Sequence, residues 1–195
     1  MKNSVQNIVK GYLKNYSDES EKLIKLCSLL KNEDDNFSKL FNRKNFEGHI
    51  TASAFIYCID ERKLLLLEHK ALKKFLQPGG HVEMIDKEII DAAKREILEE
   101  TGLKDFNIVS IDEDINIPFD IDTHFIPDND KKNEKGHYHH DFRYLFTVLK
   151  AHGVQLDFNE STGYKWVSID ELKNQERFIT IIEKIENLVN SKTKK

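Results

Sequence analysis

Three glutamates lie close together near the middle of the chain, at Glu96, Glu99 and Glu100. On a helix, spacings of three and four residues place them on one face. They come just before Gly102, where a helix end is already negative and where Lys or Arg would be stabilising. Such crowding of like charges breaks a local rule of stability and is typical of a functional site. A hard cation with oxygen ligands, most simply Mg²⁺, would relieve the repulsion.

The elements around these glutamates are expected to hold them in place. The periodicity predicts a helix over residues 87–101, ended by Gly102 in the left-handed conformation. The Pro-Gly-Gly sequence at residues 78–80 predicts a tight turn ahead of it. The buried stripe of the helix is expected to consist of Ile89, Ile90, Ala93, Ile97 and Leu98.

The rest of the chain predicts a sheet with helices on both of its faces. Strands are expected at residues 49–59, 64–69, 107–111, 114–126, 137–150 and 165–167, and amphipathic helices follow from residue 168. Residues 1–47 predict a helical hairpin with apolar positions at Val5, Ile8, Val9, Leu13, Leu23, Ile24, Leu26, Cys27 and Leu30. We therefore expect an N-terminal helical extension over residues 1–47 and a main domain over residues 48–195.

The composition excludes several classes of protein. The 195 residues are enough for one domain of ordinary size, and a net charge of −4 gives no reason to expect a nucleic-acid polymer as partner. The two cysteines, Cys27 and Cys58, lie in dissimilar contexts and predict no disulfide framework. The N-terminus lacks an apolar signal core and no segment could span a bilayer, so we expect a cytoplasmic protein without a membrane partner.

Two segments together resemble a known motif. Gly79-Gly80-His81-Val82-Glu83, followed by the Arg-Glu-Ile-Leu-Glu-Glu-Thr-Gly-Leu sequence of residues 95–103, resembles the Nudix box. The second segment matches the box at every defined position, and the resemblance extends over residues 48–172. One residue more than usual separates Gly80 from Arg95. The first glutamate of the box consequently has no clean counterpart, because counting from the two ends gives Asp86 or Lys87, with Glu88 next to it.

The resemblance implies an α/β/α sandwich with a mixed sheet, and an enzyme. It implies Mg²⁺-dependent hydrolysis, with Mn²⁺ as an alternative ion, of a diphosphate linkage in a nucleoside diphosphate derivative. The metal ligands would be Glu96, Glu99, Glu100 and the carbonyl of Gly79. Arg95 would hold the carboxylates of the preceding loop through ion pairs.

A further acid precedes the strand that contains Trp166. Glu160 lies six residues before that tryptophan, where members of the resembled family often place a metal ligand or a general base. Glu96 is the rival for the role of base. An ordinary solvated loop acid is the other interpretation of Glu160.

A second polar group lies on the strand predicted over residues 137–150. Alternation places His137, His139, Asp141 and Arg143 on one face, and the segment at residues 120–124 carries Asp120, Asp122 and His124 in the same way. Three interpretations stay open: a pocket that contacts phosphate or ribose, a transition-metal site, and an ordinary hydrogen-bonded strand face. We expect the two aspartates at residues 120 and 122 to be exposed or paired with histidine. The pattern is similar to that of a little-characterised bacterial branch of Nudix proteins.

Two other functions compete with Mg²⁺-dependent hydrolysis. A non-catalytic nucleotide sensor would be favoured by loss of one of the three box carboxylates Glu96, Glu99 and Glu100, and none of these is lost. A zinc hydrolase built on His137, His139 and Asp141 would resemble metallo-β-lactamases, but Phe142 stands where their motif needs a histidine. The expected partner is a small molecule, and the resemblance leaves the oligomeric state open, with a homodimer as one option.

Overall fold

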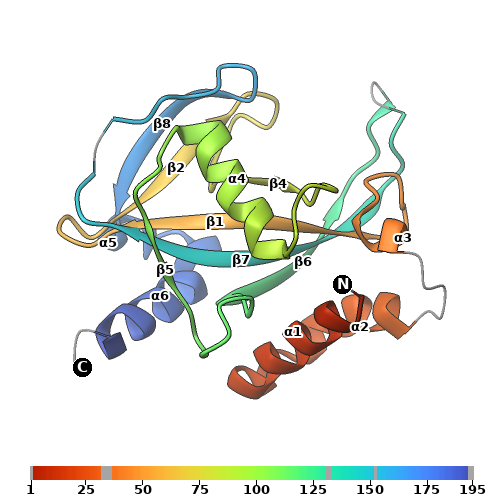
Figure 1. Cartoon of the computed structure of the whole chain (residues 1–195). Coiled ribbons are helices and arrows are strands. Elements are labelled where there is room, and N and C mark those ends of the chain that lie inside the picture. The colour runs from red at the N-terminus through yellow and green to blue at the C-terminus, as the bar shows by residue number, and fades with distance from the viewer. Residues whose placement is uncertain (1, 32–36, 131–132, 152, 193–195) are drawn as a thin grey trace.

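The protein is built on one eight-stranded mixed sheet (Figure 1). The computed structural model describes residues 2–31, 37–130, 133–151 and 153–192. The main path of the sheet has the order β3-β2-β1-β7-β5, while β4 pairs with β1, β6 with β7 and β8 with β2. The strands are β1 His49–Cys58, β2 Lys63–His69, β3 Lys74–Leu76, β4 Gly79–His81, β5 Asn107–Val109, β6 Asp120–Ile126, β7 His137–Val148 and β8 Ser161–Ser168.

Strand β1 is the centre of the sheet, and all ten of its residues are buried. It runs parallel to β7 along its whole length, with His49 opposite His139 and Cys58 opposite Val148. On its other side it pairs first with β4 and, toward its end, with β2. This change of partner brings the short strand β4 beside the first half of β1.

Helices cover both faces of the sheet, as the resemblance implied (Figure 1). Helix α4, Ile89–Thr101, lies on one face, against Ile50, Ala52 and the other even-numbered residues of β1. Helix α6, Ile179–Lys192, packs on the other face in a second apolar cluster with Phe55 and Tyr57. The short helix α5, Ile169–Leu172, contributes to that same second cluster. No helix within the described ranges is both long and apolar enough to cross a membrane.

The N-terminal helices pack onto the sheet. Helix α1, Lys2–Asn15, buries Val5 and Val9 in the same core as Ile121 of β6, and α2, Ile24–Lys31, and α3, Phe37–Phe41, follow. The segment between α1 and α2 forms two 3₁₀ turns, Ser17–Glu19 and Glu21–Leu23, without side-chain caps. The prediction that Ile24 lies on the apolar face of α2 was wrong, because its side chain is 61% exposed. Leu29, which was not predicted, is buried on that helix.

Helix α4 begins at Ile89, where the backbone N–H of Glu88 donates to Asp91. It ends at Gly102 with φ 67°, so the predicted left-handed cap is confirmed. Leu98 was wrongly assigned to the buried stripe, since it is 48% exposed. The strand expected to start at residue 114 starts at Asp120.

Candidate active site

The buried face of α4 carries two of the three box glutamates next to β4. Glu96 and Glu100 are each only 8% exposed, whereas Glu99 is exposed. Glu100 Oε1 accepts a hydrogen bond from the backbone N–H of Gly79 at 2.8 Å. A Cβ added at Gly80 would lie 2.4 Å from Glu96 Oε1. The Gly-Gly pair therefore permits the close approach of backbone to carboxylate that a larger residue would block.

The carboxylates at this site repel one another. Burial raises the pKa of Glu100 to about 8, and the nearby charges of Glu96, Glu160 and Asp157 act in the same direction against the hydrogen bond from the backbone. Burial also raises the pKa of Glu96, where the ion pair with Arg95 opposes it. The structure thus brings the turn before β8, with Glu160, within electrostatic reach of the α4 glutamates.

Within the part of the chain that the structure describes, Arg95 is the basic residue that pairs with the box glutamates. Its Nη1 donates to Glu96 at 2.7 Å and to Glu99 at 2.9 Å, while its Nη2 donates to the carbonyl of His81 at 2.8 Å. Its Nε and Nη2 also donate to the two carboxylate oxygens of Asp86, at 3.2 and 3.1 Å. The ion pair expected between Arg95 and a loop carboxylate is therefore present.

Of the residues near the position of the first box glutamate, Asp86 is the one that contacts the helix of the other glutamates. It is buried, pairs with Arg95, and accepts the backbone N–H of Glu83 at 2.8 Å. Glu88, the neighbouring candidate, instead sits at the start of α4. The additional residue is accommodated in the turn, so that the loop is still tied to the helix.

The donor set suits a hard divalent ion. Four carboxylates converge on one region, two of them buried, and their mutual repulsion is relieved only in part by one guanidinium. The absence of a side chain at Gly80 leaves the Glu96 carboxylate room against β4. Gly79 contributes its N–H to Glu100, and the role expected for its carbonyl stays a prediction.

Asp141 and Arg143 of β7 are engaged with each other and with their neighbours. The Asp141 carboxylate accepts from Thr51 at 3.1 Å, from Ser53 at 2.7 Å and from Arg143 Nε at 3.1 Å. Arg143 also forms ion pairs with Asp120 at 3.1 Å and with Asp122 at 2.9 Å. For this pair the geometry favours the hydrogen-bonded strand face, because three carboxylates already neutralise the guanidinium.

The prediction for Asp120 was wrong. This residue is 3% exposed and pairs with Lys184 of α6 at 2.7 Å and with Arg143, rather than with histidine or solvent. Although burial acts to raise it, these cations hold the pKa of Asp120 down to about 2. Asp122 pairs with His124 at 2.8 Å, as expected. Asp120 thereby links β6 to the helix behind the sheet.

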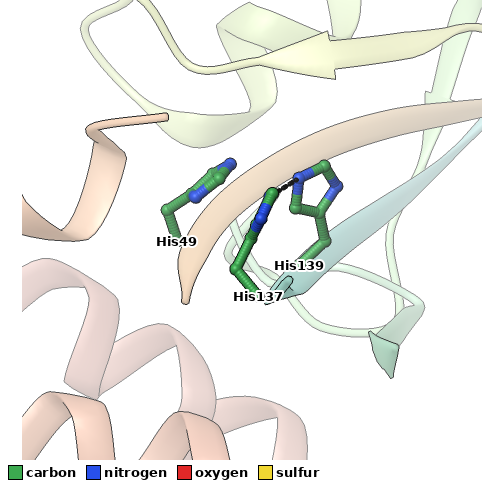
Figure 2. A group of neighbouring side chains, drawn as sticks. All are labelled: His49, His137 and His139. Carbon is green, nitrogen blue, oxygen red and sulfur yellow. Dashed lines mark hydrogen bonds between the residues drawn. The ribbon is translucent and has the colours of Figure 1, made fainter. Parts of the chain in front are cut away.

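His137 and His139 belong to a histidine cluster that extends beyond β7. His49 of β1 lies beside both of them (Figure 2), and the ring of His81 of β4 stacks on His49 at 5.1 Å between centroids. Burial, together with the neighbouring rings, lowers the pKa of His49 to about 4 and that of His139 to about 2. His49 and His81 were not among the residues predicted from the sequence, and only the alternation of His49 with Thr51 and Ser53 could have indicated a shared face.

Comparisons with known proteins agree with this geometry. The NUDIX domain family model matches residues 49–185. The chain is 40% identical over 140 residues to a protein of Lactococcus lactis subsp. cremoris named "Probable DHNTP pyrophosphohydrolase", covering 68% of this chain and 72% of that protein.

Solved structures share the fold. A NUDIX family hydrolase from Clostridium perfringens is 30% identical, with a TM-score of 0.55, and the match covers 75% of this chain and 99% of that one. The dihydroneopterin triphosphate pyrophosphohydrolase of E. coli is 14% identical, with a TM-score of 0.54. The match covers 72% of this chain and 95% of that one, and it supports the fold alone. The chain belongs to the Nudix family and is a Nudix-type pyrophosphohydrolase.

Proposed function

We propose that this enzyme hydrolyses a diphosphate linkage in a nucleotide-like triphosphate or diphosphate derivative with Mg²⁺, or alternatively Mn²⁺. The observation that carries the proposal is the group of four glutamates around Gly79 and Gly80, with the pKa of Glu100 raised to about 8. The name of the Lactococcus relative supports dihydroneopterin triphosphate as the first compound to test.

The residues divide the work between them. Glu96, Glu99 and Glu100 would hold the metal, with the carbonyl of Gly79 as a further ligand, while Glu160 would be either another ligand or the general base. When bound, Mg²⁺ would supply neutralisation of the diphosphate charge and activation of water. Arg95, through Asp86, fixes the loop that carries β4 against α4. Glu160 is exposed in its turn, so its carboxylate can take a proton from a water molecule and pass it to solvent.

The structure bears on the choice of general base. Glu96 is buried, and its carboxylate accepts a hydrogen bond from Arg95 Nη1 at 2.7 Å, which restricts the movement of the side chain. Glu160 is exposed, and its turn is held by backbone hydrogen bonds: its carbonyl accepts from the N–H of Lys70, and its N–H donates to the carbonyl of Asp157. We therefore assign the base to Glu160 and the metal to Glu96.

The test is a substrate screen in EDTA-treated buffer with added Mg²⁺ or Mn²⁺. Dihydroneopterin triphosphate, nucleoside triphosphates, nucleotide sugars and dinucleoside polyphosphates are compared by chromatography of the products. We expect pyrophosphate or a nucleoside monophosphate to appear only with metal, and Glu99→Gln to remove this activity. Failure of folded protein to hydrolyse any of these compounds with either metal would reject the proposal.

The main rival is a nucleotide sensor that binds without turnover. The three carboxylates of the second box segment, Glu96, Glu99 and Glu100, are all retained on one helix, which a binding module would not require. Tight binding of a compound that is never cleaved would support the sensor.

We further propose a cytoplasmic location, in keeping with the free cysteines Cys27 and Cys58, and a small molecule as the partner. A homodimer stays a prediction, to be tested by size-exclusion measurements.

A further inference from the structure

Three histidines from two strands converge on the face of the sheet opposite α4. His49 starts β1, while His137 and His139 lie near the start of β7 (Figure 2). The residues of β1 that pack with α4 are the even-numbered ones, and alternation therefore sends His49 to the other face. One nitrogen from each of the three rings lies within 4.8 Å of the other two.

The hydrogen bonds of the rings direct their nitrogens toward one another. Nδ1 of His137 lies 2.6 Å from the carbonyl of Lys135, and Nδ1 of His49 lies 3.4 Å from the carbonyl of Asn45. Because a carbonyl oxygen only accepts, both Nδ1 atoms carry the proton, and both Nε2 atoms carry a lone pair. Backbone carbonyls orient metal-binding histidines in this same way.

The Nε2 of His49 has no hydrogen-bond partner, although the residue is 0% exposed. A buried polar nitrogen without a partner costs stability, so its retention calls for an explanation. The Nε2 of His137, in turn, lies 3.2 Å from Nε2 of His139. Two neighbouring imidazoles share one proton there, and a bound cation would replace it.

We propose that His49, His137 and His139 form a binding site for a transition-metal ion of the Zn²⁺ class, separate from the carboxylate site. Neutral imidazoles select zinc, copper, nickel or iron, whereas Mg²⁺ prefers oxygen ligands. Two nitrogens bound to one tetrahedral zinc lie about 3.4 Å apart, because each bond is about 2.1 Å. The Nε2 atoms of His137 and His139 are already 3.2 Å apart, so movement of the His49 ring toward them would complete the site. The rings of His81 and His124, centred 5.6 and 5.7 Å from that of His139, offer a fourth ligand.

The site would join distant segments of the chain. It ties the start of β1 to the start of β7, and His81 extends the cluster to β4. The carbonyl of His81 accepts a hydrogen bond from the guanidinium of Arg95 on α4. Strand β4 therefore connects the histidine cluster to the helix of the box glutamates. A metal bound here would stabilise the strands that lie beside the helix of the box glutamates.

The direct test is metal titration of untagged, full-length protein stripped with a chelator, since an affinity tag would itself bind metal. Co²⁺ alone is added as a spectroscopic probe, and Zn²⁺ alone is then used to displace it. We expect visible absorption bands of a nitrogen-ligated ion at one equivalent. The double variant His137→Gln with His139→Gln should lose about 100-fold or more in affinity, since ligand loss costs at least as much as loss of an orienting partner.

Two controls separate this site from others. His69→Gln, which changes a histidine outside the cluster, should leave the titration unchanged. Glu99→Gln should also leave it unchanged, because that residue belongs to the carboxylate site. Equal Co²⁺ binding in wild-type protein and the double variant would overturn the proposal, as would absence of binding in the wild type.

A third measurement does not depend on any variant folding. X-ray absorption at the zinc edge of the loaded wild-type protein should show at least three imidazole nitrogens at about 2.0–2.1 Å. A shell of oxygen atoms alone would place the ion at the glutamates and refute the histidine site. Hydrolysis measured with Mg²⁺ before and after removal of zinc tests the catalytic proposal separately, so the two proposals fail independently.

Discussion

Replacing Glu100 by glutamine should stabilise the metal-free enzyme while it removes catalysis. The side chain is 8% exposed and its oxygen accepts the backbone N–H of Gly79 at 2.8 Å. Glutamine keeps an oxygen for this hydrogen bond and removes the charge. The fold therefore retains its contact between α4 and β4 and loses a repelling carboxylate.

The size of the effect follows from the raised pKa of Glu100. The pKa rises from 4.5 to about 8, so the charged form is disfavoured in the folded state. The stability that this group contributes is fully present below about pH 4.5 and is lost as the pH rises toward 8. At pH 7.5 the loss of unfolding free energy caused by this charge is at most about 4 kcal/mol, because each pH unit above about 4.5 corresponds to about 1.4 kcal/mol.

The assay is thermal unfolding in EDTA between pH 5 and pH 8. If Glu100→Gln recovers only a quarter of this maximum loss, about 1 kcal/mol, Tm rises by about 2–4 °C in a chain of this size. We expect Glu100→Gln to match the wild type near pH 5 and to exceed it progressively toward pH 8. Saturating Mg²⁺ should narrow the difference, because a metal that binds only the folded state stabilises the wild type.

Glu99→Gln is the matched control. Glu99 lies on the same helix, one residue away, and is exposed. Its replacement should abolish hydrolysis without the pH-dependent gain in Tm. If Glu100→Gln is no more stable than the wild type at pH 8, the argument from buried charge is wrong; if either variant keeps full turnover, the proposed site is wrong.

Three further predictions test other parts of the structure. Glu160→Gln should lower kcat by about 10²–10³-fold with little change in KM, as expected for a general base, whereas weaker binding with unchanged kcat would reject that role. Gly80→Ala would place a methyl group 2.4 Å from Glu96 Oε1 and should lower kcat at least about tenfold, while Gly153→Ala, whose added Cβ meets nothing within 4 Å, should have no effect on turnover. Asp120→Asn should destabilise the fold by about 3 kcal/mol in urea unfolding at pH 7, because it leaves buried cations without their carboxylate. Since the pKa of this carboxyl is lowered to about 2, the loss should be present above about pH 4 and should vanish as the pH falls through 2; a loss that does not change with pH would contradict this account.

Local patterns in the sequence were sufficient to predict helix α4, which carries the box glutamates, and the overall class of fold. The spacing of Glu96, Glu99 and Glu100 depends only on the helical repeat, and the cap at Gly102 only on the conformational freedom of glycine. Four consecutive leucines at residues 64–67 are typical of a strand buried on both faces, and all four are buried in β2. Each of these features arises within a few residues along the chain.

Tertiary structure decided which distant groups meet. Asp86, rather than Lys87 or Glu88, pairs with Arg95 because the turn before α4 directs it inward, and counting along the box could not settle that choice. His49 joins His137 and His139 only through the parallel register of β1 and β7, which lie more than eighty residues apart. Side-chain periodicity assigns a residue to a face of its own strand. Which strands lie side by side depends on the packing of the whole chain, and that packing brings together both the carboxylate cluster and the histidine cluster.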